Sequence, residues 1–185
     1  MNKIILASSS PRRKELLERE GIDFIVDASS IVEEFHDDLS IEDKLCHLAY
    51  DKALPIHMKY PDDIVIGADT IVYAHGKIIG KPKDQEEAKN ILLSLSNDCH
   101  EVMSAVAIYK EGQWHTFCEK TKVHFKDIRL MIDDYLQQDE WIDKAGGYAI
   151  QGIGRQFVDH IEGDFDNVVG LPVKRVKEYL VSDRF

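Results

Sequence analysis

Apolar residues recur three and four positions apart along several segments, which is the spacing of one helix face. The clearest such face begins after Ser40, where Asp43 three residues later resembles a capping box. Its members are Leu45, Leu48, Ala49, Lys52, Ala53 and Ile56, so a lysine stands in the middle of an apolar stripe. Further helices are predicted over residues 11–20 with Ser10 as the cap, from Asp84, over residues 127–138, and after Pro172.

Short apolar runs between turn residues predict strands. These strands cover residues 3–7, 62–68, 71–74, 77–79, 102–109, 114–125 and 157–161, with hairpin turns at His75-Gly76 and Glu111-Gly112. Because strands and helices mix and several strands are joined by hairpins, we predict an α/β fold with a long, curved, mixed sheet flanked by helices. We expect a single domain over residues 1–185, whose length also allows two lobes around a central cleft.

Composition and charge narrow the classes of function. The formal net charge of −11 argues against a broad electropositive surface for DNA or RNA, but it leaves room for a small anionic ligand held by a local cationic cluster. No apolar run approaches the roughly 20 residues of a spanning helix, and the N-terminal apolar run is too short for a secretion signal, so no membrane association is expected. The three cysteines lack the spacing of a disulfide framework or a zinc knuckle, which favours a reducing cytoplasm.

Two basic features could bind an anion. The segment Ser8-Ser9-Ser10-Pro11-Arg12-Arg13 joins a strand to a helix start, where backbone N–H groups, hydroxyls and two arginines can all donate to phosphate oxygens. The alternative is a capped surface helix with two solvated arginines. Lys52 could aim its ammonium into a cleft, or its stem could simply pass over apolar neighbours to reach water.

Other segments could complete a site. Asp69 follows the strand predicted over residues 62–68, so its carboxylate would lie at the carboxyl end of that strand and could hold a divalent metal or orient a water; the alternative is a turn aspartate. Lys81 in Gly80-Lys81-Pro82 could add a second phosphate ligand. Gln151 lies among four glycines and could bind a ring edge with its amide, or the segment could be only a glycine-rich turn.

These pieces, in this order, resemble one family. The segments are ILASSSPRRKELL at the N-terminus, DKA at 51–53, GADTIV at 67–72, GKP at 80–82, KAGGYAIQGIG at 144–154 and NVVGLP at 167–172. Together they resemble the Maf family. The resemblance implies a cytoplasmic nucleoside triphosphate pyrophosphatase that releases pyrophosphate and a nucleoside monophosphate. It also implies an elongated α/β fold similar to that of inosine triphosphate pyrophosphatases, a divalent cation (Mg²⁺ or Mn²⁺), and a homodimer.

The resemblance also implies roles for residues of this chain. Triphosphate binding falls to Ser8, Arg12, Arg13, Lys52 and Lys81. Asp69 would accept a proton and, with Glu33, hold the metal. Arg12, Thr70 and Gln151 match positions associated with base selectivity.

On those selectivity positions the chain resembles the dTTP/UTP branch of the family. A 7-methyl-GTP pyrophosphatase, or a nucleotide-binding regulator of cell division with little catalysis, are the alternatives. Two segments depart from the family pattern, MSAV at 103–106 and Phe165, and neither is expected to touch the positions with implied roles.

Overall fold

The computed structural model describes residues 2–28 and 39–182. The chain divides into two compact units. The first unit consists of residues 1–70, 104–119 and 170–185, and the second of residues 71–103 and 120–169. None of the helices described has both the length and the apolar character that crossing a bilayer requires.

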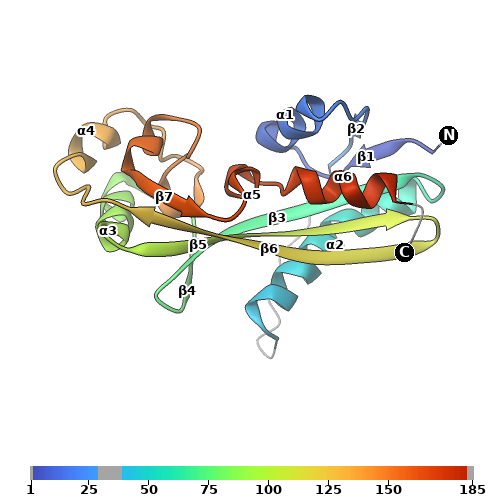
Figure 1. Cartoon of the computed structure of the whole chain (residues 1–185), viewed down its shortest axis with the longest axis horizontal. Coiled ribbons are helices and arrows are strands. Elements are labelled where there is room, and N and C mark those ends of the chain that lie inside the picture. Colours follow the sequence, from blue (N-terminus) through green and yellow to red (C-terminus); the bar gives the residue numbers. More distant parts are fainter. Residues whose placement is uncertain (1, 29–38, 183–185) are drawn as a thin grey trace. The chain divides into compact units, whose positions relative to one another are not determined.

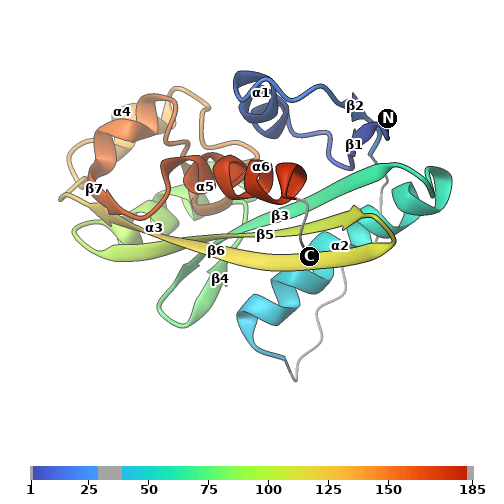
Figure 2. The ribbon, with the colours of Figure 1, turned by 45° about the vertical axis from the view of Figure 1, so that its right-hand side comes forward.

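The first unit holds the N-terminal and C-terminal segments of the chain. Its complete elements are β1 (Ile4–Leu6), α1 (Pro11–Arg19), β2 (Ile25–Val26), α2 (Ile41–Lys59) and α6 (Val173–Val181). Three long strands contribute residues to both units: β3 (Ile64–Ala74), β5 (Cys99–Lys110) and β6 (Gln113–Phe125). Within this unit α1 lies beside β2 (Figures 1 and 2).

The second unit is built from the middle of the chain. Its complete elements are β4 (Lys77–Ile79), α3 (Gln85–Leu95), α4 (Ile132–Leu136), two 3₁₀ turns (Ala145–Gly147 and Ile153–Phe157), β7 (Val158–Glu162) and α5 (Phe165–Val169). Asp84 accepts a hydrogen bond from Glu87 N (2.8 Å) and so caps α3 as predicted.

The strands form one mixed sheet in the order β2-β1-β3-β5-β6-β7, and β4 pairs with β3. β1 is parallel to both of its neighbours, whereas the β3–β4 and β6–β7 pairs are antiparallel. This mixed sheet with flanking helices confirms the predicted fold class (Figure 1).

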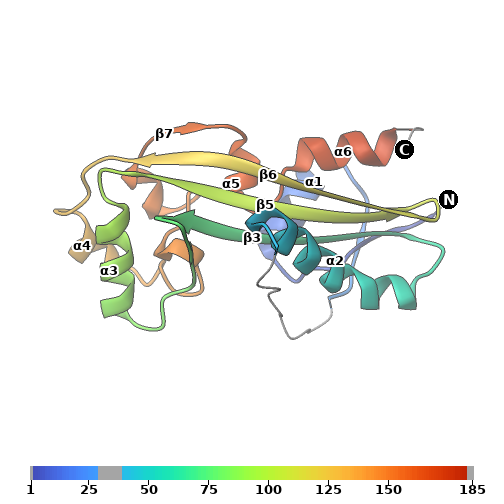
Figure 3. The same ribbon diagram turned by 90° about the horizontal axis from the view of Figure 1, so that it is seen from below.

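In the first unit, α2 and α6 cover opposite faces of the sheet (Figure 3). The ring of Trp114 on β6 lies 4.8 Å from that of Tyr50 on α2, whereas Phe117 stacks on Tyr179 of α6 at 5.1 Å. Residues three apart on a strand point to opposite faces, so these contacts place one helix on each side. Ser40 accepts a hydrogen bond from Asp43 N (3.1 Å), which confirms the predicted start of α2.

Three predicted elements were wrong in detail. The strands predicted over residues 62–68 and 71–74 are parts of one strand, β3, which begins at Ile64 and continues through Asp69 and Thr70, whose side chains find partners without leaving the ladder. The helix predicted over residues 127–138 is reduced to α4, because Asp127 accepts hydrogen bonds from the backbone and side chain of Arg129 and holds a turn there. Ser10 occupies the N-cap position of α1 but makes no side-chain capping bond.

Candidate active site

Close packing of α2 on β3 brings Lys52 and Asp69 together. A Cβ atom on Gly67 would lie 2.4 Å from the carbonyl oxygen of Ala49 and 2.7 Å from Cβ of Ala53, so only glycine allows this approach. Two residues further along β3, on the same face, the Asp69 carboxylate accepts a hydrogen bond from the ammonium of Lys52. The two side chains are 15% and 20% exposed, so the pair is partly shielded from water.

Asp69 therefore lies within a strand, and the expectation that it follows the end of one was wrong. The strand that ends beside this part of β3 is its neighbour β1. Ala7 N donates to Ile66 O (2.8 Å), and the next carbonyl on that edge of β3, Ala68 O, receives Arg13 Nη1 instead (2.9 Å). The edge of β3 is thus open to side chains from α1, which is how the sheet presents Asp69 beside the segment that begins at Ser8.

Arg13 connects several segments of the first unit through hydrogen bonds. Besides Ala68 O, its guanidinium donates to Ser8 Oγ (3.0 Å), Thr70 Oγ1 (3.1 Å) and Gly170 O (2.9 Å). Burial lowers its pKa, and the nearby Asp69 carboxylate opposes that effect. Four of the five N–H donors of an arginine are thereby used, and within the described part of the chain one hydrogen on Nη2 remains for a ligand.

The hydroxyl of Thr70 is fully engaged. Besides accepting from Arg13, it lies 3.2 Å from Gly170 O, to which it can donate, and 2.8 Å from the buried Ser104 Oγ, where either hydroxyl can be the donor. The expectation that the MSAV segment touches no position with an implied role was therefore wrong, because Ser104 belongs to it.

Arg12 differs from Arg13. It is half-buried at the start of α1, and burial lowers its pKa. Across residues 2–28 and 39–182 it has no hydrogen-bond or ion-pair partner, so its donors are available to a ligand. The helix N-terminus beside it favours an anion. Ser8, at the start of the same segment, is buried and also accepts a hydrogen bond from Ser10 N (3.3 Å).

Lys81 and Gln151 belong to the second unit, on segments that are bonded to each other. Gly146 N donates to Gly80 O (3.1 Å), so the Gly80-Lys81-Pro82 segment is attached to the glycine-rich segment. Both Lys81 and Gln151 have exposed side chains.

Glu140 fixes the segment that carries Gln151, and the sequence pattern did not single it out. Its carboxylate accepts hydrogen bonds from Ile153 N (2.6 Å) and Gly154 N (2.8 Å). A Cβ atom on Gly152 would lie 2.1 Å from Glu140 Oε2, so a side chain at that position would displace this carboxylate. No local motif around Glu140 could have indicated this role, whereas Gly170 lies within the NVVGLP segment that carried the resemblance.

One of the two predicted carboxylate ligands for a divalent cation, Asp69, lies among the described residues. Asp69 offers a carboxylate, and Mg²⁺ is commonly held by one or two carboxylates together with substrate phosphates. The chemistry of this donor therefore fits Mg²⁺ or Mn²⁺. Glu33, the second predicted metal ligand, lies outside the described residues.

Relatives with closely similar sequences cover nearly the whole chain. A "dTTP/UTP pyrophosphatase" of Pyrococcus furiosus is 47% identical over 174 residues, which is 94% of this chain and 91% of that protein. A protein of the same name from Bacillus pumilus is 45% identical over 181 residues (97% and 96%), and one from Halalkalibacterium halodurans is 44% identical over 190 residues (100% of both chains).

Solved structures resemble this fold at low sequence identity. A "Nucleoside-triphosphatase / dITP/XTP pyrophosphatase" from Mycobacterium abscessus aligns with a TM-score of 0.41 and 18% identity over 66% of this chain and 74% of its own. A "HAM1 protein" from Coxiella burnetii aligns with a TM-score of 0.42 and 15% identity over 68% and 73% of the two chains. The family model described as "Maf-like protein" matches residues 3–182. With that match, and with relatives above 40% identity along its length, the chain belongs to the Maf family.

Proposed function

We propose that this protein is a nucleoside triphosphate pyrophosphatase that hydrolyses dTTP and UTP to the nucleoside monophosphate and pyrophosphate. The observation that carries the proposal is the Lys52–Asp69 pair, which stands at the open edge of β3 in the same unit as the Ser8–Arg13 segment. One carboxylate and several cationic donors are what a reaction at a triphosphate requires. The close relatives that carry the name "dTTP/UTP pyrophosphatase" support the same function.

Each residue then has a separate task. Asp69 accepts a proton from the water that attacks the α-phosphorus, as the new P–O bond forms and the bond to the bridging oxygen of pyrophosphate breaks. Arg12, with no hydrogen-bond or ion-pair partner among the described residues, binds the triphosphate directly, and Lys52, which contacts Asp69, binds a phosphate oxygen beside it. Arg13 holds Ser8, Ala68 and Gly170 in place and offers its one remaining donor.

Asp69, together with Glu33, would hold the divalent cation. Such a cation neutralises phosphate charge and lowers the pKa of a bound water. In the second unit, we assign Lys81 to the triphosphate and Gln151 to the base, with Glu140 fixing the backbone of the Gln151 segment.

The preference for uracil and thymine follows from the amide of Gln151. Both bases present an acceptor at position 4 and a donor at N3, an edge that a glutamine amide can match. Cytosine reverses that pattern, so an amide held in the orientation that suits uracil would leave polar groups of the complex unpaired, at about 1–3 kcal/mol for each mismatch.

A nucleotide panel tests this function. Pyrophosphate release from dTTP, UTP, CTP, ATP, GTP and 7-methyl-GTP is measured with and without Mg²⁺. We expect dTTP and UTP to exceed the others. A higher rate with CTP or 7-methyl-GTP would contradict the assignment, and pyrophosphate release from none of them would point to a nucleotide-binding regulator.

The role of Asp69 is tested by Asp69→Asn. The amide keeps the size of the side chain but cannot accept the proton, so we expect turnover of UTP to fall at least about 100-fold. Thermal unfolding of the variant in the absence of nucleotide serves as the control for folding. Turnover close to that of the unaltered protein would remove Asp69 from the mechanism.

Location and assembly are proposed on the resemblance to the family. We propose that the protein acts in the cytoplasm, where its nucleotide substrates occur, and that it forms a homodimer. Light scattering on the purified full chain measures the assembly, and a monomeric mass at micromolar concentration would contradict the dimer.

A further inference from the structure

Two histidines face each other across the β6–β7 pair in the second unit. His124 and His160 are direct register partners, and their rings are nearly parallel, with centroids 4.1 Å apart and an interplanar angle of 9°. The paired strands thus hold two imidazoles side by side, and a turn of one ring out of the parallel stack would let a nitrogen of each face the same ion.

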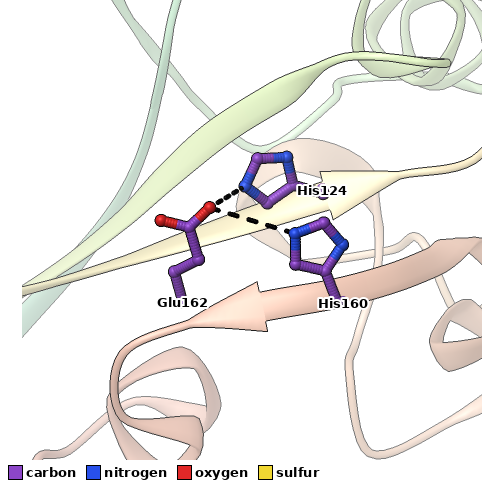
Figure 4. A group of neighbouring side chains, drawn as sticks. All are labelled: His124, His160 and Glu162. Carbon is purple, nitrogen blue, oxygen red and sulfur yellow. Dashed lines mark hydrogen bonds and ion pairs between the residues drawn. The ribbon is translucent and has the colours of Figure 1, made fainter.

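Glu162 joins this pair from the same face of β7 (Figure 4). Its Oε1 atom lies 2.9 Å from His124 Nε2 and 3.9 Å from His160 Nε2. One ligand atom from each of these three residues lies within 4.8 Å of the others. In a tetrahedral zinc site with bonds of about 2.1 Å, ligand atoms are about 3.4 Å apart, so both distances to Glu162 need to change by only about 0.5 Å.

The surroundings suit a metal ligand set. Asp159 Oδ2 lies 2.8 Å from His160 Nδ1, and a carboxylate on one ring nitrogen directs the other nitrogen toward a metal. Cys99 Sγ lies 3.6 Å from His124 Nε2. A surface depression of about 480 Å³ is lined by both histidines, Cys99 and Asp159, so solvent and ions reach the cluster.

We propose that His124, His160 and Glu162 form a binding site for Zn²⁺ or a similar transition-metal ion, separate from the site around Asp69. Two imidazoles and a carboxylate are a zinc ligand set with a fourth position open to water. Imidazole ligands favour zinc over Mg²⁺, which prefers oxygen donors. Binding through His124 Nε2 would require the neutral tautomer that carries its proton on Nδ1, so that Nε2 and Glu162 Oε1, 2.9 Å apart, can both be ligands.

A metal bound at this site would stabilise strand β7. This strand ends the order of the sheet, so among the strands of the described residues it pairs only with β6. A metal bound by one residue of β6 and two of β7 would fasten this terminal strand and make thermal stability depend on zinc concentration.

Calorimetric titration of the full chain with ZnCl₂ tests the site, together with thermal unfolding in ZnCl₂ and in MgCl₂. We expect one zinc ion per chain and a rise in Tm that MgCl₂ does not reproduce. His160→Gln and Glu162→Gln should each weaken zinc binding at least about 100-fold, and Asp159→Asn about 10- to 100-fold. The matched control is His47→Gln, which removes an exposed histidine from α2 and should leave zinc binding unchanged.

Two results would contradict the zinc site. If the unaltered chain binds no zinc, or if His160→Gln and Glu162→Gln keep its affinity, the proposal is overturned. Metal-free unfolding curves show whether each variant folds, which the exposure of His160 (54%) and Glu162 (56%) favours. Because none of these residues is assigned to catalysis, nucleotide hydrolysis with Mg²⁺ should persist in every variant, and this distinguishes failure of the zinc site from failure of the proposed activity.

Discussion

Adjacent arginines at the start of α1 have different surroundings. Arg13 donates four hydrogen bonds to groups of the first unit, including the carbonyl of Gly170, 157 residues away in the sequence. Arg12 has no such partner among the described residues. We infer that one arginine mainly organises the site and the other mainly binds the ligand.

Lysine substitutions separate these roles. Arg13→Lys keeps the charge but loses the forked geometry, so we expect the free energy of unfolding to fall by about 2–3 kcal/mol. Arg12→Lys should leave stability within about 0.5 kcal/mol while raising KM for UTP. Urea unfolding and steady-state kinetics on both variants measure this, and equal loss of stability in the two would contradict the division of roles.

The Lys52–Asp69 pair yields a double-mutant test. Lys52→Met leaves the half-buried carboxylate of Asp69 without its ammonium, which should cost about 1–3 kcal/mol of stability as well as activity. Adding Asp69→Asn removes the unpaired charge, so the double variant should regain stability but not turnover. A double variant as unstable as Lys52→Met would show that the pair is not coupled.

At the scale of elements, the contact of α2 with β3 sets the geometry of the site. Gly67 allows the approach, and the strand continues through Asp69 and Thr70, so consecutive residues face opposite sides of the sheet. Asp69 meets α2, while Thr70 meets Arg13 and Ser104. One continuous strand thus supplies a reactive carboxylate and a structural hydroxyl side by side.

Gly67→Ala tests this packing. The added methyl group would overlap the backbone of Ala49, so we expect a loss of about 1–3 kcal/mol in stability and a fall in turnover as Lys52 moves away from Asp69. Gly80→Ala is the matched control, because apart from its chain neighbours no heavy atom of the described residues lies within 4 Å of its added Cβ. Urea unfolding of both variants gives the comparison, and equal stability would mean that α2 adjusts without cost.

At the scale of the whole molecule, a buried histidine links stability to pH. Burial lowers the pKa of His100 from its ordinary value of 6.5 to about 4, and its Nε2 lies 2.7 Å from the hydroxyl of Tyr148. Between pH 6.5 and pH 4 the unfolded chain binds a proton that the folded chain does not. Stability contributed by neutral His100 is therefore present near pH 7 and falls as the pH drops through this window, by up to about 3 kcal/mol.

Urea unfolding at pH 7 and pH 4.5 measures this loss, and in His100→Gln the same comparison should show a smaller difference. Arg129 lowers the pKa of Asp127 from 3.8 to about 2, so the stability that this carboxylate contributes is lost only below about pH 4. It therefore does not affect the comparison between pH 7 and pH 4.5. An unchanged pH dependence in the variant would assign the acid sensitivity to other groups.

Much of the architecture is local and was predictable from the sequence. The capping residues Ser40 and Asp84, the turn residues at His75-Gly76 and the apolar runs act within a few positions of themselves, so they predicted α2, α3 and the β3–β4 hairpin. Phosphate chemistry needs hydroxyls, cations and a carboxylate, which is why the sequence pointed to the Ser8–Arg13 segment, Lys52 and Asp69 as candidate site residues. The family resemblance then implied a separate role for each.

Only the tertiary structure determined which partners each of these groups contacts. Arg13 bonds to Gly170 because β1 ends where β3 continues, and Lys52 meets Asp69 because Gly67 lets a helix approach a strand. Ser104 contacts Thr70 and Glu140 holds the segment after Gln151, although no local motif connects these residues. Likewise, His124, His160 and Glu162 converge only through the register of β6 and β7. Periodicity and caps are properties of neighbouring residues, whereas these contacts depend on packing and strand register between segments far apart in the chain.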